Sequence, residues 1–235
     1  MNILLGITGS VAAVTASNVI NGLREVGNVK VVTTKAAQDI LNRAWKPQLH
    51  EDVQFYNDYT EWSWNKIGDP IEHIDLKDWA DILVIAPLSA NTLAKMHAGM
   101  CDNLLLSIYR AWQFKEQKPV VVAPAMNTDM WNNPLTRHHL HEVGRRHGYN
   151  RWVGRDSCGS EIPEPNEGRT ISNSLFNYDW ERRDAFYTVQ PVEKKLACGV
   201  TGVGAMADIA DIVQTVREAE KNYLKDMKTS SEKSS

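Results

Sequence analysis

Three short apolar runs constrain the fold of this chain more than any other feature. They are Asn2–Thr8, Asp81–Ala86 and Pro119–Ala123. Each has the length of a single strand, and its apolar residues are continuous instead of alternating with polar ones. Continuous apolar strands are buried on both faces, which is typical of a parallel sheet with helices on both sides. We therefore expect these runs to form the centre of such a sheet.

Segments with helical patterns separate these strands. The first strand leads into apolar residues at helical spacing between Ser10 and Val26, with Gly27 as the expected C-cap. Ser89 is placed to cap a helix that ends at Gly99. The alternation predicts an α/β fold with a doubly wound, flavodoxin-like or Rossmann-like parallel sheet in three α/β/α layers. Further expected elements are strands at 29–33 and 189–196, helices at 36–41, 103–112 and 208–224, a helical turn at 75–80, and a loop with one short strand at 49–71.

The length and composition favour one domain. The chain has 235 residues, of which 43% are apolar, and this is enough for a single domain with a buried core. We expect that domain to cover residues 1–225, followed by a polar, disordered tail at 226–235. Residues 151–187 interrupt the strand–helix alternation with glycines, prolines and clustered charges, so we expect a loop excursion there.

Charge and cysteine content exclude several function classes. The net charge is −3, and the 26 basic and 29 acidic residues are mixed along the chain, so no basic face for nucleic acid is expected. No apolar run reaches the length of a membrane span, and the N-terminal run lacks the features of a signal peptide. The three cysteines show no CxxC spacing, which argues against a disulfide framework and against a zinc site. Free thiols of this kind indicate a reducing, cytoplasmic location.

Three strand ends are suited to an anion. In a doubly wound sheet, ligands bind beyond the carboxyl ends of the strands, where backbone N–H groups and hydroxyls at helix N-termini favour phosphate. The first loop lacks the third glycine of a dinucleotide fingerprint, so a mononucleotide is favoured over NAD. Tight turns or ordinary helix caps would explain each loop separately, and the convergence of three loops is what favours a binding site. The residues concerned are Gly9, Ser10 and Val11 in the first loop, Thr34, Lys35 and Ala36 in the second, and Ser89, Ala90, Asn91 and Thr92 in the third.

The segment Pro124–Trp131 follows another strand and carries Asn127 and Met130. An asparagine amide can donate two hydrogen bonds to a carboxylate without adding charge, and a methionine can cover an apolar ligand. A neutral donor suits decarboxylation, because a cation would stabilise the ground-state carboxylate more than the transition state that resembles carbon dioxide. Alternatively, the apolar residues only staple the following helix. The residues alone leave both interpretations open.

Two further segments contain reactive side chains. Cys198 lies in the glycine-rich stretch Lys194–Met206, which we call the flap, and such segments often order over a ligand. The alternative is a small buried apolar residue beside a turn. His73 precedes the helical turn 75–80, and an isolated histidine is more often a surface or core residue than a catalytic one. We expect His138, His139, His141 and His147 to lie on a solvated helix face, without a metal.

Together with Trp64–Pro70 and Ala86–Lys95, these motifs resemble those of the homo-oligomeric flavin-containing Cys decarboxylases. Within that family, the resemblance is to the members that act on 4′-phosphopantothenoylcysteine, and it extends over residues 2–149 and 190–216. It implies that FMN is the cofactor, bound by the ten residues of the three loops and by Ala125. It also implies that His73 is the active-site base, that Asn127 and Met130 contact the substrate, and that Cys198 is the proton donor. The flap residues implied to contact the substrate are Lys195, Leu196 and Ala197.

The resemblance also implies a reaction and an assembly. The reaction is decarboxylation of 4′-phosphopantothenoylcysteine to 4′-phosphopantetheine in coenzyme A biosynthesis. FMN oxidises the cysteine end to a thioaldehyde, carbon dioxide leaves, and the resulting enethiol is reduced again while Cys198 supplies a proton. The implied assembly is a homotrimer with FMN between subunits, and with His73 and the flap presented across the interface.

Other members of the family leave alternatives. Some are non-catalytic or hetero-oligomeric regulators that bind a protein phosphatase, some decarboxylate the C-terminal cysteine of a peptide, and some transfer a prenyl group to flavin. This chain combines His73, Asn127 and Cys198 and has no long acidic tail, which favours a self-sufficient enzyme. It departs from the family pattern at Asp78, where a second basic residue is expected, although Lys77 lies beside it.

Overall fold

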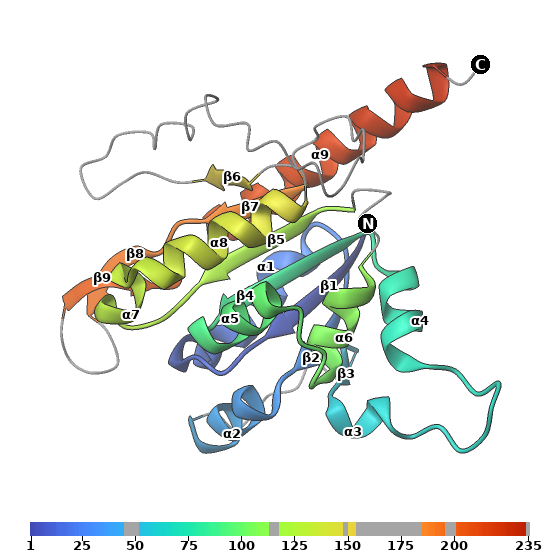
Figure 1. Ribbon diagram of the computed structural model, residues 1–235, viewed down its shortest axis with the longest axis horizontal. Coiled ribbons are helices and arrows are strands. Elements are labelled where there is room, and N and C mark those ends of the chain that lie inside the picture. Colours follow the sequence, from blue (N-terminus) through green and yellow to red (C-terminus); the bar gives the residue numbers. More distant parts are fainter. Residues whose placement is uncertain (45–51, 113–117, 148–149, 154–184, 196–200, 234–235) are drawn as a thin grey trace.

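The computed structural model describes residues 1–44, 52–112, 118–147, 150–153, 185–195 and 201–233 (Figure 1). Its main feature is a seven-stranded parallel sheet with the strand order β3-β2-β1-β4-β5-β7-β6. A separate antiparallel hairpin consists of β8 and β9. The strands are β1 (Asn2–Ile7), β2 (Asn28–Thr33), β3 (Gln54–Tyr56), β4 (Ile82–Leu88), β5 (Val120–Pro124), β6 (Asn150–Val153), β7 (Phe186–Val189), β8 (Val192–Lys195) and β9 (Thr201–Ala205).

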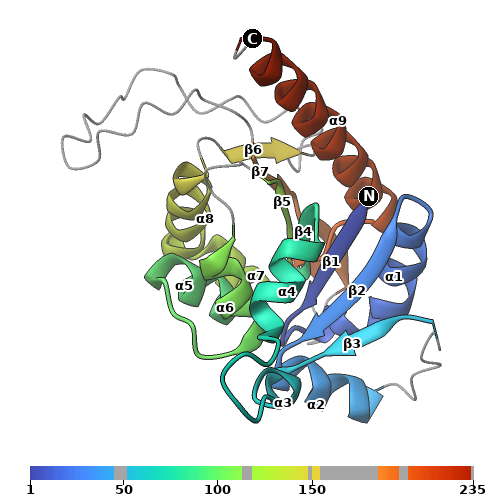
Figure 2. The same ribbon diagram turned by 90° about the vertical axis from the view of Figure 1, so that its right-hand side faces the viewer.

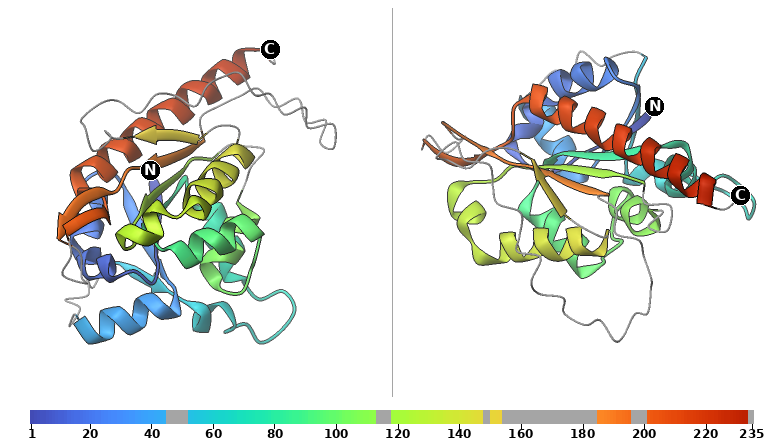
Figure 3. Two further views of the ribbon diagram at one scale, coloured as in Figure 1. Left: turned by 60° about the vertical axis from the view of Figure 1, so that its left-hand side comes forward. Right: turned by 90° about the horizontal axis from the view of Figure 1, so that it is seen from above.

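Helices cover both faces of the sheet. The α1 and α9 helices lie on one side, whereas α5, α6 and α8 lie on the other (Figures 2 and 3). None of the helices in the described ranges is long and apolar enough to cross a bilayer. The helices are η1 (Val11–Thr15, a 3₁₀ helix), α1 (Ala16–Arg24), α2 (Lys35–Ala44), α3 (Asp58–Glu61), α4 (Glu72–Trp79), α5 (Ala90–Ala98), α6 (Leu104–Ala111), α7 (Thr128–Asn132), α8 (Pro134–Arg146) and α9 (Ile209–Lys233).

Each central strand contributes to two hydrophobic cores. Ile3 and Leu5 of β1 pack in the core beneath α1 and α9, whereas Leu4 packs in the core beneath α4, α5, α6 and α8. Successive side chains of a strand point to opposite faces of the sheet, so burial on both faces requires a continuous apolar run. The predicted doubly wound, three-layer α/β fold is therefore confirmed.

The first helix differs from its predicted form. It begins as the 3₁₀ helix η1, and α1 ends at Arg24 with Glu25 as the C-cap, so Gly27 does not cap it. Gly27 instead packs against the start of the chain, where a Cβ atom would lie 2.4 Å from the Met1 carbonyl oxygen. A close backbone approach, and not a left-handed cap, is what requires glycine at this position.

The α4 helix begins earlier than the predicted helical turn at 75–80. It starts at Glu72, so His73 lies in its first turn and not before the helix. Glu72 and Asp75 place negative charge at the positive helix end. At the other end, the Lys118 ammonium donates to the carbonyl oxygens of Ala80, at 2.8 Å, and Lys77, at 3.4 Å. A cation there satisfies terminal carbonyl groups and fixes α4 to the segment before β5.

The C-terminal third also departs from expectation. Residues 189–196 do not form one strand, because β7 ends at Val189 and Pro191, which cannot donate to a ladder, precedes the separate strand β8. The ends of the expected excursion, 151–153 and 186–187, belong to β6 and β7, while residues 154–184 lie outside the described residues. The α9 helix continues to Lys233, whereas a disordered tail was expected from residue 226.

His147 is not on a solvated helix face. His138 and His141 are exposed as expected, but His147 is only 3% exposed and closes α8 at its C-terminal end. Its Nε2 atom lies 3.0 Å from the Tyr109 hydroxyl, and its ring packs on Phe186 of β7. Burial, followed by the nearby charge of Arg146, lowers the pKa of His147 to about 3. The folded protein therefore keeps this imidazole neutral.

This buried histidine predicts a loss of stability in acid. The pKa of an unfolded histidine is about 6.5, so between that pH and about 3 the unfolded chain binds more protons at His147 than the folded protein does. Within this window, we expect His147 to lower the free energy of unfolding by about 1.4 kcal/mol for each unit of decreasing pH. His147→Gln should make the decline shallower, as measured by urea unfolding at pH 7 and pH 5. His141→Gln, on the exposed face of α8, should keep the wild-type slope. Equal slopes in all three proteins would contradict the prediction.

Candidate active site

The predicted cofactor residues converge on one edge of the sheet. The strands β1, β2, β4 and β5 are parallel, and their registers bring Gly6 beside Val32 and Ile85. The loops that follow these strands are therefore neighbours. The structure thus brings together the four predicted groups, which are Gly9–Val11, Thr34–Ala36, Ser89–Thr92 and Ala125.

Thr8 joins two of these loops. Its buried hydroxyl donates to the Pro87 carbonyl oxygen at 2.7 Å and accepts from the Ser89 backbone N–H at 2.8 Å. The end of β1 is therefore bonded directly to the start of α5. No role for Thr8 was predicted from the sequence. The available signal was a single hydroxyl between an apolar strand and Gly9.

The remaining loops are in equally close contact. A Cβ atom on Gly9 would lie 2.5 Å from the Cβ of Ala36, so only glycine allows the first loop to approach α2 this closely. The Thr34 N–H donates to the Ile7 carbonyl oxygen at 3.1 Å. The Ala125 N–H likewise donates to the Leu88 carbonyl oxygen at 2.9 Å. The four loops therefore form one connected surface.

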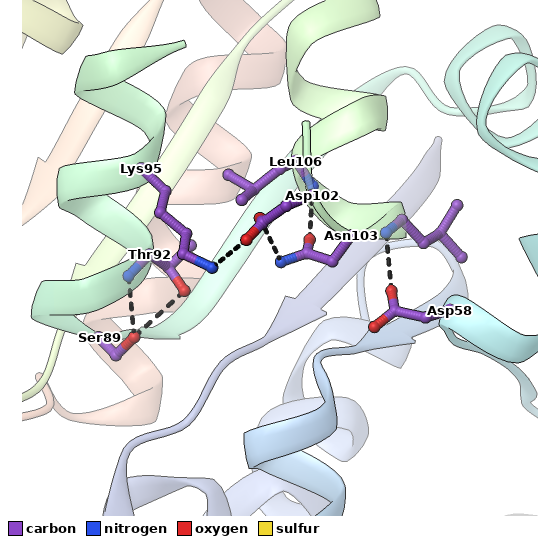
Figure 4. Close-up of polar contacts among 8 residues, drawn as sticks. Asp58, Ser89, Thr92, Lys95, Asp102, Asn103 and Leu106 are labelled. Carbon is purple, nitrogen blue, oxygen red and sulfur yellow. Dashed lines mark hydrogen bonds and ion pairs between the residues drawn. The ribbon is translucent and has the colours of Figure 1, made fainter. Parts of the chain in front are cut away.

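The serines of this surface cap helices. Ser10 accepts from the Ala12 N–H at 3.4 Å, and Ser89 accepts from the Thr92 N–H at 3.2 Å. Figure 4 shows the Ser89–Thr92 contacts at the start of α5, with Lys95 paired to Asp102 farther along the chain. Helix capping, considered above as the alternative to ligand binding, is thus confirmed for both serines. The positive ends of α2 and α5, which begin after β2 and β4, point towards this edge beside the exposed Lys35, which suits a bound anion.

Asn127 and Met130 lie beside this surface on α7. The Asn127 side-chain oxygen accepts from the Met130 N–H at 2.8 Å and caps the helix. This bond uses the oxygen and leaves the amide –NH₂ group of an exposed side chain available to a ligand. Met130 is 52% exposed, and Thr136 donates to its carbonyl oxygen at 2.5 Å. The arrangement is consistent with the predicted neutral donor and apolar cover.

The base of the flap packs against the same segment. The Met126 N–H donates to the Gly204 carbonyl oxygen at 2.9 Å. A Cβ atom on Gly204, where φ is +136°, would lie 2.3 Å from the Met126 carbonyl oxygen, and one on Gly202 would lie 2.3 Å from Thr128 Oγ1. Lys195 is the last residue of β8. The predicted flap residues Leu196, Ala197 and Cys198 lie outside the described residues.

His73 is held by a carboxylate that sequence reasoning missed. Its Nδ1 atom lies 2.5 Å from Glu61 Oε1, and its backbone N–H donates to Glu61 Oε2 at 3.1 Å. The available sequence signal was the pair Asn57 and Thr60, which forms a capping box at the start of α3. Among the described residues, no hydrogen bond or ion pair joins His73 to the four loops or to Asn127.

Lys77 and Asp78 follow one turn later on α4. The Lys77 ammonium lies 2.5 Å from the Asp78 carboxylate, so the basic residue that was expected to compensate for Asp78 is paired with it. The Lys77 side chain is largely buried, with 13% of its surface exposed. The pair itself is neutral, so Asp75 leaves α4 with a net negative charge beyond His73.

The chain is similar to several known proteins. A model of the family described as Flavoprotein matches residues 1–220. A probable phosphopantothenoylcysteine decarboxylase from Arabidopsis thaliana is 44% identical over 216 residues, which are 92% of this chain and 86% of the relative. A solved structure of a PPC decarboxylase mutant, with serine in place of a cysteine and in complex with pantothenoylaminoethenethiol, has a TM-score of 0.72 and 40% identity, covering 94% of this chain and 98% of that one. The FMN binding protein AtHal3 has a TM-score of 0.67 and 41% identity, covering 92% and 94%.

The Thr8 hydroxyl is expected to stabilise the arrangement of the loops. Thr8→Val removes the hydroxyl at nearly constant shape and leaves the Ser89 N–H without its acceptor. An unsatisfied buried donor costs about 1–3 kcal/mol, so we expect a loss of that size in the free energy of unfolding. The control is Thr215→Val, because Thr215 is also buried but, among the described residues, its hydroxyl bonds only within α9, to the Asp211 carbonyl oxygen. Urea unfolding of both variants checks the prediction, and equal losses would contradict it.

Proposed function

This chain belongs to the Flavoprotein family, and on that premise we propose that it decarboxylates 4′-phosphopantothenoylcysteine to 4′-phosphopantetheine, a step of coenzyme A synthesis. FMN is its cofactor, and it is a decarboxylase. The observation that carries the proposal is the convergence of four strand-end loops, bonded to one another through Thr8, beside the Asn127 amide.

The residues at the sheet edge fit the phosphate of FMN. Two helix N-termini, the Lys35 ammonium and loop backbone groups all favour an anion. Gly9 allows the close approach of the first loop to α2. We assign FMN contacts to Gly9–Val11, Thr34–Ala36, Ser89–Thr92 and Ala125. When bound, FMN would supply the two-electron oxidation of the cysteine end that lets carbon dioxide leave, followed by the reduction that completes the product.

The residues of this chain would orient the substrate and move its protons. The Asn127 amide donates to the substrate carboxylate without the charge that would stabilise the ground state. Met130 covers the apolar part of the substrate, together with Lys195, Leu196 and Ala197. His73 accepts a proton during oxidation of the substrate, and Cys198 donates one in the final step.

The position of His73 also bears on the assembly. Since His73 has no hydrogen bond to the loops of its own chain among the described residues, we propose that it acts at the site of a neighbouring subunit in a homotrimer. The mixed charges along the sequence and the three cysteines without CxxC spacing are consistent with a cytoplasmic enzyme.

The first test is the reaction itself. We expect purified protein to carry FMN and to convert 4′-phosphopantothenoylcysteine into carbon dioxide and 4′-phosphopantetheine, followed by flavin absorbance and product mass. A colourless protein that does not take up FMN would contradict the proposal. A yellow protein without this activity would instead favour the regulatory class of relatives, and binding to a protein phosphatase would then be measured.

Cys198→Ser separates the two halves of the reaction. We expect this variant to release carbon dioxide at close to the wild-type rate in a single turnover, because loss of carbon dioxide precedes the proton donation assigned to Cys198. The product should then be the unreduced enethiol, which is lighter than 4′-phosphopantetheine by two hydrogen atoms in mass spectrometry. Cys101→Ser provides the control, since Cys101 is exposed on the surface, and it should form the normal product. Normal product from Cys198→Ser would remove Cys198 from the mechanism.

A further inference from the structure

Glu61 is a buried carboxylate next to the proposed base. Among the residues whose burial the structure describes, it is the only Asp or Glu that is buried. Its side chain is 8% exposed, compared with 26% for His73. Removing a carboxylate from water is costly unless hydrogen bonds or charges compensate. Both oxygens of Glu61 contact the same residue, so His73 provides that compensation.

The two contacts determine which ring nitrogen of His73 carries a hydrogen. An ionised carboxylate only accepts hydrogen bonds, so the 2.5 Å contact from Nδ1 to Oε1 requires a hydrogen on Nδ1. In the neutral imidazole, Nε2 then has a free lone pair, and it has no hydrogen-bond partner among the described residues. A base must have such a lone pair. When Nε2 takes a proton, the adjacent carboxylate also stabilises the imidazolium that forms.

The helix that carries Glu61 is itself fixed in place. Asp58, in the first turn of α3, accepts from the Leu104 backbone N–H at 2.8 Å, and in Figure 4 its side chain points towards the start of α6. The α6 helix is deeply buried, and α4 packs against it. One end of α3 is therefore bonded to α6 and the other to α4. This short helix sets the distance between Glu61 and His73.

We infer that α3 is a positioning element of the active site, in which Glu61 fixes the tautomer and orientation of His73 and Asp58 fixes α3 on α6. The inference deepens the proposed function, because it rests on His73 acting as the base. Glu61 itself contacts neither substrate nor cofactor in this proposal. Its effect passes through the imidazole ring.

Glu61→Gln gives a sharp test, because it forces the opposite tautomer. The backbone N–H of His73 always needs an acceptor, so the amide oxygen of glutamine would turn towards it. The amide –NH₂ group would then face Nδ1, which must lose its hydrogen to accept the bond. The hydrogen would move to Nε2 and remove the lone pair used by the base. We expect kcat to fall by about 10²–10⁴-fold, the usual contribution of a general base, with little change in KM or FMN content.

The tautomer can be observed directly. In protein labelled with ¹⁵N at histidine, the two ring nitrogens of His73, assigned by comparison with His73→Asn, should show the hydrogen on Nδ1 in the wild type and on Nε2 in Glu61→Gln. Loss of stability alone would lower activity without exchanging these two signals. Wild-type signals in Glu61→Gln, or exchanged signals with wild-type kcat, would each overturn the inference.

Glu72→Gln is the matched control. Glu72 precedes His73 in the same turn of α4, and burial, then the charges of Asp75 and Glu61, raise its pKa. The substitution removes a carboxylate beside His73 without removing a hydrogen bond to its ring. We expect wild-type tautomer signals and kcat. A loss of kcat equal to that of Glu61→Gln would show that nearby charge matters and positioning does not, which would overturn the inference.

A second pair of variants tests the attachment of α3. Asp58→Asn keeps an oxygen that can accept from the Leu104 N–H, whereas Asp58→Ala does not. We expect Asp58→Asn to retain kcat and Asp58→Ala to lower it by up to about 10²-fold, the effect of misplacing a catalytic group by about 1 Å. Equal kcat values in the two variants would overturn the role of Asp58.

The outcome can be separated from that of the proposed function. If the wild-type protein binds FMN but does not release carbon dioxide, the proposed function fails in the activity assay alone. The ¹⁵N signals of wild type, Glu61→Gln and Glu72→Gln require no turnover, so they still decide whether Glu61 fixes the His73 tautomer.

Discussion

The candidate site depends on one buried hydroxyl group, that of Thr8 at the carboxyl end of the central strand β1. The chain changes its direction of winding between β1 and β4, and loops at such a point diverge and leave a crevice. The Thr8 hydroxyl spans this point, with one bond to the end of β4 and one to the start of α5. The contacts of Gly9 with α2 and of Ala125 with Leu88 extend the same surface on either side. These contacts fix the four loops of the binding surface to one another and to the ends of the strands.

The α4 helix is the second rigid part of the site. Lys118 satisfies carbonyl groups at its C-terminal end, and Glu61 satisfies a backbone N–H at its N-terminal end. Both partners come from outside the helix, so packing and polar contacts hold it from opposite ends. A side chain on such a helix keeps its orientation better than one on a loop. This matters most for a residue that must meet a ligand on another subunit, as proposed for His73.

The sequence predicted those parts of the molecule that depend on local patterns. Continuous apolar runs identified the central strands, and Ser89 and Gly99 marked both ends of α5 correctly. The start of α4 was missed because its N-cap, Ile71, has no capping side chain. The extension of α9 was missed because Lys225–Lys233 is polar, although such residues readily form helix once one has begun.

Contacts between distant residues could not be predicted in this way. Thr8 and Ser89 are 81 positions apart, and no pattern within either segment indicates that they meet. The Glu61–His73 contact similarly requires α3 and α4 to be packed together before the two side chains can approach. The chemistry of each predicted side chain follows from its residue type. The neighbouring residue that fixes its position, such as Glu61 for His73, is visible only in the tertiary structure.

Finally, the glycines of β9 make two parts of the site interdependent. A Cβ atom on Gly204 would meet the Met126 carbonyl oxygen and one on Gly202 would meet the Thr128 hydroxyl, so β9 packs directly on the segment that carries Asn127. Residues in such contact have non-additive effects when changed together. Substitutions in α7 that adapt the site to a bulkier or smaller substrate would therefore be epistatic with substitutions in β9. A change in α7 that is tolerated with one β9 sequence would be harmful with another. Exchange of Pro124–Trp131 between relatives should accordingly succeed only when β9 is exchanged with it.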